Sequence, residues 1–257
     1  MKIAITGKGG VGKTTLAGTL ARLFAKEGHS VLAIDADPDA NLASAIGIGP
    51  EVFQTLTPFS KMKELAKERT GAEDGYGTFF RLNPKVDDLP EEFCIEHAGV
   101  KLLAMGTIDQ GGSGCVCPEN TLIKRLMQHL LVERDEVVIM DMEAGIEHLG
   151  RGTAESVDAL IVVVEPGRRS IQTAHQIKGL AKDIGIERVF LVASKLQNPE
   201  DLAFLEAQLP EFSFLGDVGF SEAIKEADMK GISLADGPLE ILAQFITIKE
   251  ALTAKLK

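Results

Sequence analysis

The sequence predicts an α/β fold, a doubly wound and mostly parallel sheet with helices on both faces. Three observations predict it: short apolar runs alternate with helical patterns, several runs are continuously apolar, and the first leads into a glycine-rich turn and a helix. Continuously apolar strands suit a parallel sheet that is covered on both faces. Strands alternating with helices imply right-handed βαβ crossovers.

Each predicted element follows from its hydrophobic pattern. The predicted strands cover residues 2–6, 29–37, 100–106, 135–142, 159–166 and 187–195. The predicted helices cover about 14–27, 119–133, 170–184 and a core-packing segment from 238 to the terminus. Residues 51–99 are polar and predict one helix and a surface excursion. Because no linker interrupts the chain, we expect residues 1–257 to form a single domain.

The charge of the chain excludes several kinds of partner. Its 27 basic and 38 acidic residues give a formal net charge of −11, whereas non-specific nucleic-acid binding and anionic membrane surfaces need a positive field. No apolar run approaches the roughly 20 residues that span a bilayer. The opening residues MKIAIT lead into a strand and lack a signal-peptide pattern, so we expect a cytoplasmic protein. Three cysteines in a chain of this size do not suggest a disulfide framework.

A phosphate-binding motif follows the first strand. Residues 7–14, GKGGVGKT, fit the pattern G-x-x-x-x-G-K-[ST] at the start of a helix. The glycines let backbone N–H groups converge on phosphate oxygens, and the helix N-terminus adds favourable partial charge. Lys13 is expected to reach the β- and γ-phosphates, and the Thr14 hydroxyl to ligate Mg²⁺.

A second lysine inside this loop, Lys8 in KGGVGKTT, resembles the deviant Walker A motif of the MinD/ParA/nitrogenase iron protein class of ATPases. The resemblance implies a P-loop NTPase fold, ATP/ADP with Mg²⁺, and a nucleotide-sandwich homodimer. In that dimer Lys8 would reach across to the partner's phosphates and stabilise their charge during hydrolysis.

Two acidic segments resemble the switches of this class. DADPDANL at 35–42 resembles the first, in which Asp37 would position or activate the attacking water, Asp35 ends the strand and Asn41 lies near the same site. DMEAG at 141–145 resembles the second, in which Asp141 would touch Mg²⁺ through water and the Gly145 N–H would sense the γ-phosphate.

The base-binding end departs from the family pattern. Family members often carry an Asn-Lys pair after a late strand, and here Ser194 precedes Lys195. The backbone of 165–167 is an alternative contact for adenine. The family resemblance implies ATP as the nucleotide. The pattern N-K-x-D, which reads guanine in GTP-binding proteins, is absent from the sequence.

Two cysteines stand one residue apart in a glycine-rich loop, GSGCVCPEN at 112–120. The thiolates of Cys115 and Cys117 are soft ligands for Zn²⁺, Ni²⁺ or Cu(I). One chain supplies two donors and a closed tetrahedral site needs four, so a two-fold homodimer would complete it. Inert buried thiols and a C-x-C redox pair are the alternatives. Cys94 is isolated, and we expect it to be structural.

Together the cysteine loop, DMEAGIEHLGRGT and the phosphate loop resemble the CooC family, nickel-insertion ATPases that mature carbon monoxide dehydrogenase. The resemblance covers essentially the whole chain. It implies that ATP closes a homodimer around Ni²⁺ or Zn²⁺ held by the cysteines of both subunits, and that hydrolysis accompanies nickel delivery. The client would be carbon monoxide dehydrogenase or, for a related protein, acetyl-CoA synthase. No nucleic acid or membrane partner is expected.

Three rival functions come from other classes. A nitrogenase-type reductase needs a second, distant cysteine, and none follows Cys117. A MinD/ParA-type positioning ATPase would need a basic amphipathic tail or a basic face. A non-catalytic dimer with structural zinc would not turn over ATP.

Together these motifs predict one site. The candidate catalytic residues are Lys8, Lys13 and Asp37. The candidate nucleotide-binding residues are Gly7, Gly9, Gly10, Val11, Gly12, Lys13, Thr14, Thr15, Asp141, Gly145 and Lys195. The candidate metal ligands are Thr14 for Mg²⁺ and Cys115 and Cys117 for Ni²⁺ or Zn²⁺.

Overall fold

Eight strands form one sheet in the computed structural model of the protein, which describes residues 1–37, 40–72, 79–106, 118–144, 149 and 156–257. The strand order is β3-β4-β2-β5-β1-β6-β7-β8. All neighbours pair in parallel except β3 and β4, which are antiparallel. The strands are β1 (Lys2–Gly7), β2 (Val31–Ala36), β3 (Ile95–His97), β4 (Val100–Ala104), β5 (Val137–Met142), β6 (Ala159–Val164), β7 (Val189–Leu196) and β8 (Ser213–Gly219). The predicted doubly wound α/β fold is confirmed.

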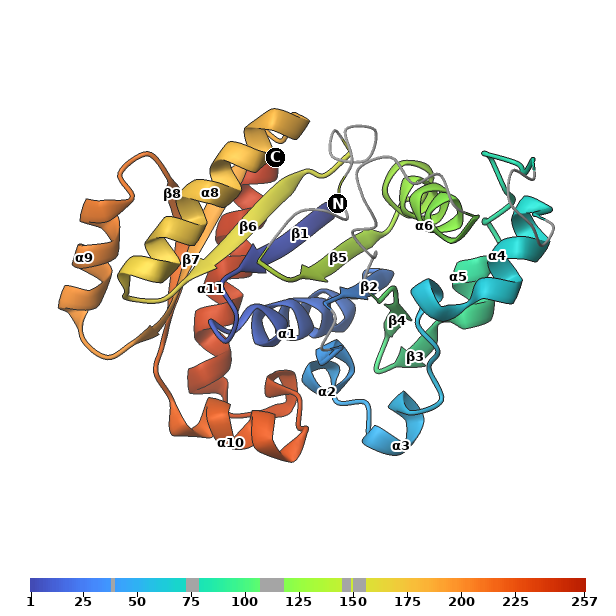
Figure 1. The fold of residues 1–257 in the computed structure, drawn as a ribbon. Coiled ribbons are helices and arrows are strands. Elements are labelled where there is room, and N and C mark those ends of the chain that lie inside the picture. Colours follow the sequence, from blue (N-terminus) through green and yellow to red (C-terminus); the bar gives the residue numbers. More distant parts are fainter. Residues whose placement is uncertain (38–39, 73–78, 107–117, 145–148, 150–155) are drawn as a thin grey trace.

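Helices cover both faces of this sheet (Figure 1). Each face has its own hydrophobic core, because successive strand residues point to opposite sides. Ala4 belongs to one core, and its neighbours Ile3 and Ile5 belong to the other. The core of Ile3 is closed by α1 (Lys13–Lys26), α2 (Leu42–Ile46) and α11 (Leu239–Leu256). The core of Ala4 is closed by α4 (Lys63–Thr70), α6 (Pro118–Gln128), α8 (Arg168–Ile184) and α9 (Pro199–Gln208).

The six predicted strands are all present, with ends that differ by a few residues. Two strands, β3 and β8, are not predicted from the sequence. β8 reads SFLGDVG, in which two glycines and an aspartate interrupt the apolar pattern, and it lies at the end of the sheet. Edge strands need to bury less surface than central ones, so their periodicity is weaker. The last turn of the predicted helix over 119–133 is a short π-helix, His129–Glu133.

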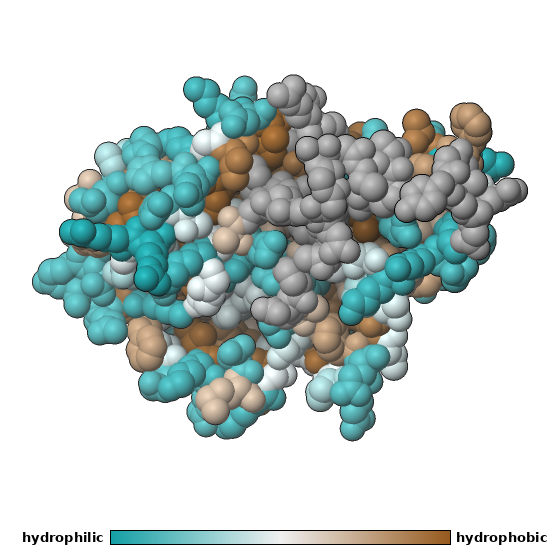
Figure 2. Space-filling model, in the orientation of Figure 1, coloured by the Kyte–Doolittle hydropathy of each residue, from teal (hydrophilic) through white to brown (hydrophobic). Residues whose placement is uncertain are grey.

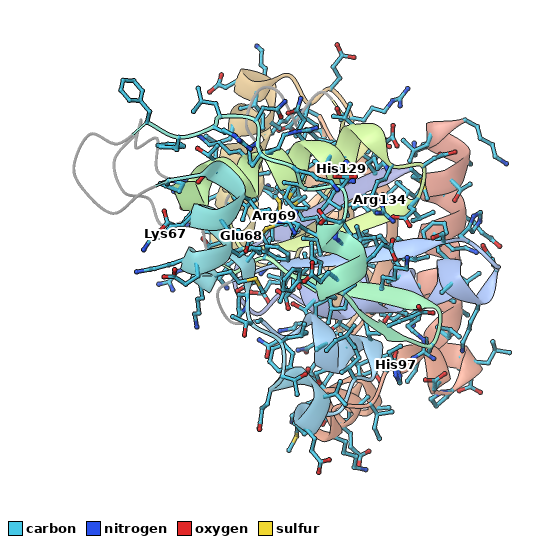
Figure 3. All side chains as sticks on the ribbon, turned by 90° about the vertical axis from the view of Figure 1, so that its right-hand side faces the viewer. Lys67, Glu68, Arg69, His97, His129 and Arg134 are labelled. Carbon is cyan, nitrogen blue, oxygen red and sulfur yellow. The ribbon has the colours of Figure 1, made fainter. Side chains whose placement is uncertain are left out.

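The segment 51–99 holds more regular structure than predicted. Besides α4 and β3 it contains α3 (Pro50–Phe53), a 3₁₀ turn (Phe59–Lys61) and α5 (Leu89–Phe93). Figure 3 shows α4, which carries Lys67, Glu68 and Arg69, beside α6 and near His129, which begins the π-helix after α6. Arg69 Nη1 lies 2.8 Å from Asp88 Oδ2 and so ties α4 to the start of α5. Four side chains of the segment, those of Phe59, Ala66, Val86 and Leu89, are buried in the same core as Ala4.

The C-terminal helix α11 packs on the core as predicted. Leu242, Phe245, Ile248 and Leu252 are buried on one side of it. In the described part of the chain, no helix combines the length and apolarity that crossing a membrane requires.

Candidate active site

The phosphate loop joins β1 to α1 at the carboxyl edge of the sheet. Gly7 has φ +144°, and a Cβ there would lie 2.4 Å from the Val163 carbonyl oxygen, so β1 and β6 approach closely only with glycine. Gly12, which precedes α1, has φ +96°, a left-handed conformation that glycine adopts without strain. No acidic residue occupies the first turn of α1. The helix N-terminus therefore offers its free N–H groups and positive partial charge to an anion.

Lys13 begins α1 and meets the first acidic segment. Its side chain is buried, and Nζ lies 3.9 Å from Asp37 Oδ2. Asp37 comes from the loop after β2, so the fold brings together two of the predicted catalytic residues. Thr14, Thr15 and Asn41 line the same cavity.

Asp35 organises the loop that carries Asp37. Its carboxylate accepts hydrogen bonds from the backbone N–H groups of Leu42, at 3.0 Å, and Asp37, at 3.3 Å. Burial raises the pKa of Asp35 to about 6, against these two hydrogen bonds, which lower it. The sequence indicates only that Asp35 ends β2. No sequence pattern indicates its two backbone partners, Asp37 and Leu42.

Asp141 stands beside Asp35 on the neighbouring strand β5, in register with it. Burial raises the pKa of Asp141 to about 7, and the nearby Asp35 adds to the rise. The Thr14 hydroxyl lies near enough to lower this pKa, and yet neither carboxylate oxygen has a hydrogen bond of normal geometry within the described residues. A buried carboxylate without such partners is costly unless a cation accompanies it. Thr14 and Asp141 thus fit the donor set that Mg²⁺ prefers.

Lys8 points elsewhere. It is absent from the described lining of the cavity, and its Nζ donates a 2.8 Å hydrogen bond to Glu165 Oε1. Glu165 follows β6, and its other oxygen lies 3.8 Å from Lys195 Nζ. Lys195 in turn donates to the Gly10 carbonyl oxygen and holds a left-handed φ of +58°. Glu165 therefore lies between two lysines at the rim of the phosphate loop, a link that no pattern in the sequence indicates.

The Ser194 hydroxyl donates its hydrogen to the backbone. This buried hydroxyl lies 2.7 Å from the Val11 carbonyl oxygen and 3.2 Å from that of Val164, and it can donate to one of them at a time. Serine replaces the asparagine that family members often have here, and its hydroxyl links β7 to the phosphate loop or to β6. Its hydrogen is therefore not available to bond a nucleobase.

The cavity at this edge has a volume of about 510 Å³ and extends well past the phosphate loop. Beyond Lys195 its described lining runs along the end of β8 and the start of α10 (Glu222–Lys230), and residues 165–167 do not take part. Apolar surface is visible around α10 at the bottom of Figure 2. Phe220, which is 51% exposed, and Ile224 line this far end. The far end thus offers an aromatic ring and an aliphatic side chain to a nucleobase, beside the polar Ser221, Lys225 and Asp228. No pattern in the sequence indicates it, because β8 was not predicted.

Three predicted site residues lie outside the described residues: Gly145 of the second switch and the metal ligands Cys115 and Cys117. Cys94 is described and is a free thiol. Burial raises its pKa to about 12, which makes it a poor nucleophile and ligand, as expected of a structural cysteine. The described residues contain no cluster of three or more His, Cys, Asp or Glu side chains that could hold a metal.

Comparison with known proteins decides the family. Residues 2–234 match the CobQ/CobB/MinD/ParA nucleotide-binding domain. The carbon monoxide dehydrogenase accessory protein CooC of Rhodospirillum rubrum is 57% identical over 236 residues, which are 92% of this chain and 90% of that protein. The chain belongs to the CooC family of MinD/ParA-type nucleotide-binding proteins. This confirms the resemblance on which the site was predicted.

Other relatives place the CooC family among the MinD/ParA proteins. An uncharacterized ATP-binding protein of Methanocaldococcus jannaschii is 47% identical over 90% of both chains. A plasmid partition protein of Borrelia burgdorferi, solved with AMPPNP, has a TM-score of 0.72 at 17% identity over 99% of both chains. MinD in the MinC:MinD complex of Aquifex aeolicus has a TM-score of 0.69 at 17% identity, over 99% of this chain and 96% of that one. At these identities the two structures show that the fold is shared.

Proposed function

We propose that this CooC-family protein is an Mg²⁺-dependent ATPase that assists nickel insertion into carbon monoxide dehydrogenase. The observation that carries the proposal is a complete phosphate loop facing Asp37 and Asp141, in a chain 57% identical to a carbon monoxide dehydrogenase accessory protein.

Each residue of the site would have one task in hydrolysis. Backbone N–H groups of 9–14 would bind the phosphates, and Lys13 would neutralise charge on the γ-phosphoryl group as its bond to the leaving oxygen breaks. Asp37 would accept a hydrogen bond from the attacking water and orient it. Thr14 directly and Asp141 through water would hold Mg²⁺, which supplies positive charge to the β- and γ-phosphate oxygens.

Coupling to nickel would require two subunits. Cys115 and Cys117 of both chains would supply four thiolates, and Lys8 of each chain would reach the other's nucleotide. Loops bound to the γ-phosphate change position when it leaves, so hydrolysis would alter the shared metal site. Nickel is the cargo in this scheme.

The test of this coupling is the affinity for Ni²⁺ in the presence of a non-hydrolysable ATP analogue and of ADP. We expect different dissociation constants in the two states. The companion assay adds the protein, ATP and Ni²⁺ to nickel-free carbon monoxide dehydrogenase and measures CO oxidation. Equal Ni²⁺ affinities and no gain in CO oxidation over Ni²⁺ alone would rule out the proposed function.

Removing the cysteine pair is expected to abolish intersubunit metal binding. Anaerobic titration with native mass measurement should find one Ni²⁺ or Zn²⁺ per two wild-type chains, and none in Cys115→Ala/Cys117→Ala. Cys94→Ala is the matched control, because that half-buried thiol is expected to contribute nothing. An unchanged stoichiometry in the double variant would instead favour inert thiols.

Phe220 is expected to stack on the nucleobase, because it lines the far end of the cavity while Ser194 is occupied by backbone carbonyls. Phe220→Ala should weaken ADP binding about tenfold, the order of one lost base–aromatic stack. Isothermal titration with Mg²⁺–ADP measures the change, and Phe204→Ala, an exposed phenylalanine on α9, is the control. If both variants bind ADP like the wild type, the base lies elsewhere.

A further inference from the structure

Lys8 forms an ion pair with Glu165 of its own chain. Lys8 belongs to the loop that binds phosphate, but its ammonium group is held by a carboxylate of the same chain at 2.8 Å, outside the cavity. A lysine that is to bind a partner's phosphates has to leave that carboxylate first.

The backbone of Glu165 is held in place beside Lys8. Glu165 follows β6 directly, and its backbone N–H donates a 3.0 Å hydrogen bond to the buried Ser170 hydroxyl at the start of α8. This bond fixes the backbone that carries the carboxylate. The side chain of Glu165 is 24% exposed and that of Lys8 is 37% exposed, so water screens the pair only in part.

A second lysine lies near Glu165 and lowers the cost of separating Lys8 from it. The second oxygen of Glu165 lies 3.8 Å from Lys195 Nζ, and Lys195 is anchored to the Gly10 carbonyl oxygen. When Lys8 departs, Glu165 keeps a cationic neighbour, so its charge is not left unpaired. The loss of Lys8 therefore costs about one exposed ion pair, and the highly charged phosphates of a bound nucleotide offer more.

We propose that Glu165 is a positioning residue that retains Lys8 in the single subunit and competes with the partner's nucleotide for it. This rests on the proposed function, in which Lys8 acts across the dimer. Glu165 thereby sets how tightly two nucleotide-loaded subunits associate and guards against dimer formation without nucleotide.

The test is the dimer dissociation constant of Glu165→Gln, measured by sedimentation velocity with Mg²⁺ and a non-hydrolysable ATP analogue. Because each dimer exchanges two Lys8–Glu165 contacts, we expect a constant about fivefold lower than in the wild type. Glu187→Gln is the matched control, since Glu187 is exposed and precedes β7 at the opposite edge of the sheet. An unchanged or higher constant in Glu165→Gln overturns the proposal.

Two more variants separate this proposal from the function on which it rests. Lys8→Met should abolish nucleotide-dependent dimers; if it does not, the transfer of Lys8 across the dimer is wrong. Lys8→Met/Glu165→Gln should match Lys8→Met, because the effect of Glu165 passes through Lys8. Tighter dimers in the double variant than in Lys8→Met would show that Glu165 acts by charge alone. Thermal unfolding confirms that each variant is folded, and Glu165→Ala repeats the test if Glu165→Gln is not.

Discussion

Lys13→Ala is expected to lower the ATPase rate at least about a hundredfold, the usual cost of removing one preorganised group that stabilises transition-state charge. Lys13 begins α1, is buried, and lies 3.9 Å from Asp37. A buried ammonium group in this position meets little competing water, so its interaction with phosphate oxygens is strong. The variant should also bind ATP more weakly, because the lysine contacts the ground state as well.

The rate is measured as phosphate release with saturating Mg²⁺–ATP. Lys182→Ala, which changes an exposed lysine on α8, is the control for the change in net charge. A Lys13→Ala rate within threefold of the wild type would contradict the assignment of the phosphate site. Loss of activity in the control as well would indicate a general effect of charge.

Asp141→Asn is expected to stabilise the protein without nucleotide while it abolishes Mg²⁺-dependent hydrolysis. Asp141 is fully buried, and burial raises its pKa to about 7. Above that pH the buried, ionised carboxylate therefore destabilises the folded state. An amide of the same shape carries no charge, so the free energy of unfolding at pH 8 should rise by on the order of 4 kcal/mol.

The raised pKa of Asp141 makes the folded protein less stable as the pH rises. In the unfolded chain Asp141 loses its proton near pH 4, and in the folded protein it keeps the proton until about pH 7. Between these values the folded state binds more protons, so the stability from this group is fully present below pH 4 and is lost as the pH rises through 7. Asp35, with a pKa raised to about 6, adds a loss of the same sign.

Urea unfolding at pH 5.5 and pH 8, with and without Mg²⁺–ADP, measures these effects. The wild type without nucleotide should lose stability between the two pH values, and Asp141→Asn should lose less. Because Mg²⁺ favours the ionised carboxylate, Mg²⁺–ADP should stabilise the wild type more at pH 8 than at pH 5.5. Asp183→Asn on the exposed face of α8 is the matched control. Equal pH dependence in all three proteins would show that Asp141 does not titrate as stated.

Much of the site can be predicted because its parts are local in the sequence. GKGGVGKT fixes a strand, a turn and a helix start within eight residues, and the glycines have the conformations that the motif requires. Asp37 follows β2 and Asp141 lies near the end of β5, both of them apolar strands, and the carboxyl ends of parallel strands share one edge. The sequence therefore determined six of the eight strands, the phosphate loop and the placing of Lys13 and Asp37 at one edge of the sheet.

Contacts between distant segments were decided only by the tertiary structure. Glu165 lies 157 residues from Lys8, and no pattern in either segment names the other. The Ser194 hydroxyl donates to a backbone carbonyl of the phosphate loop, and Phe220 lines the far end of the cavity because β8 pairs with β7. Periodicity reports which face of an element is buried, whereas a particular partner for a charge or a hydroxyl depends on how whole elements pack.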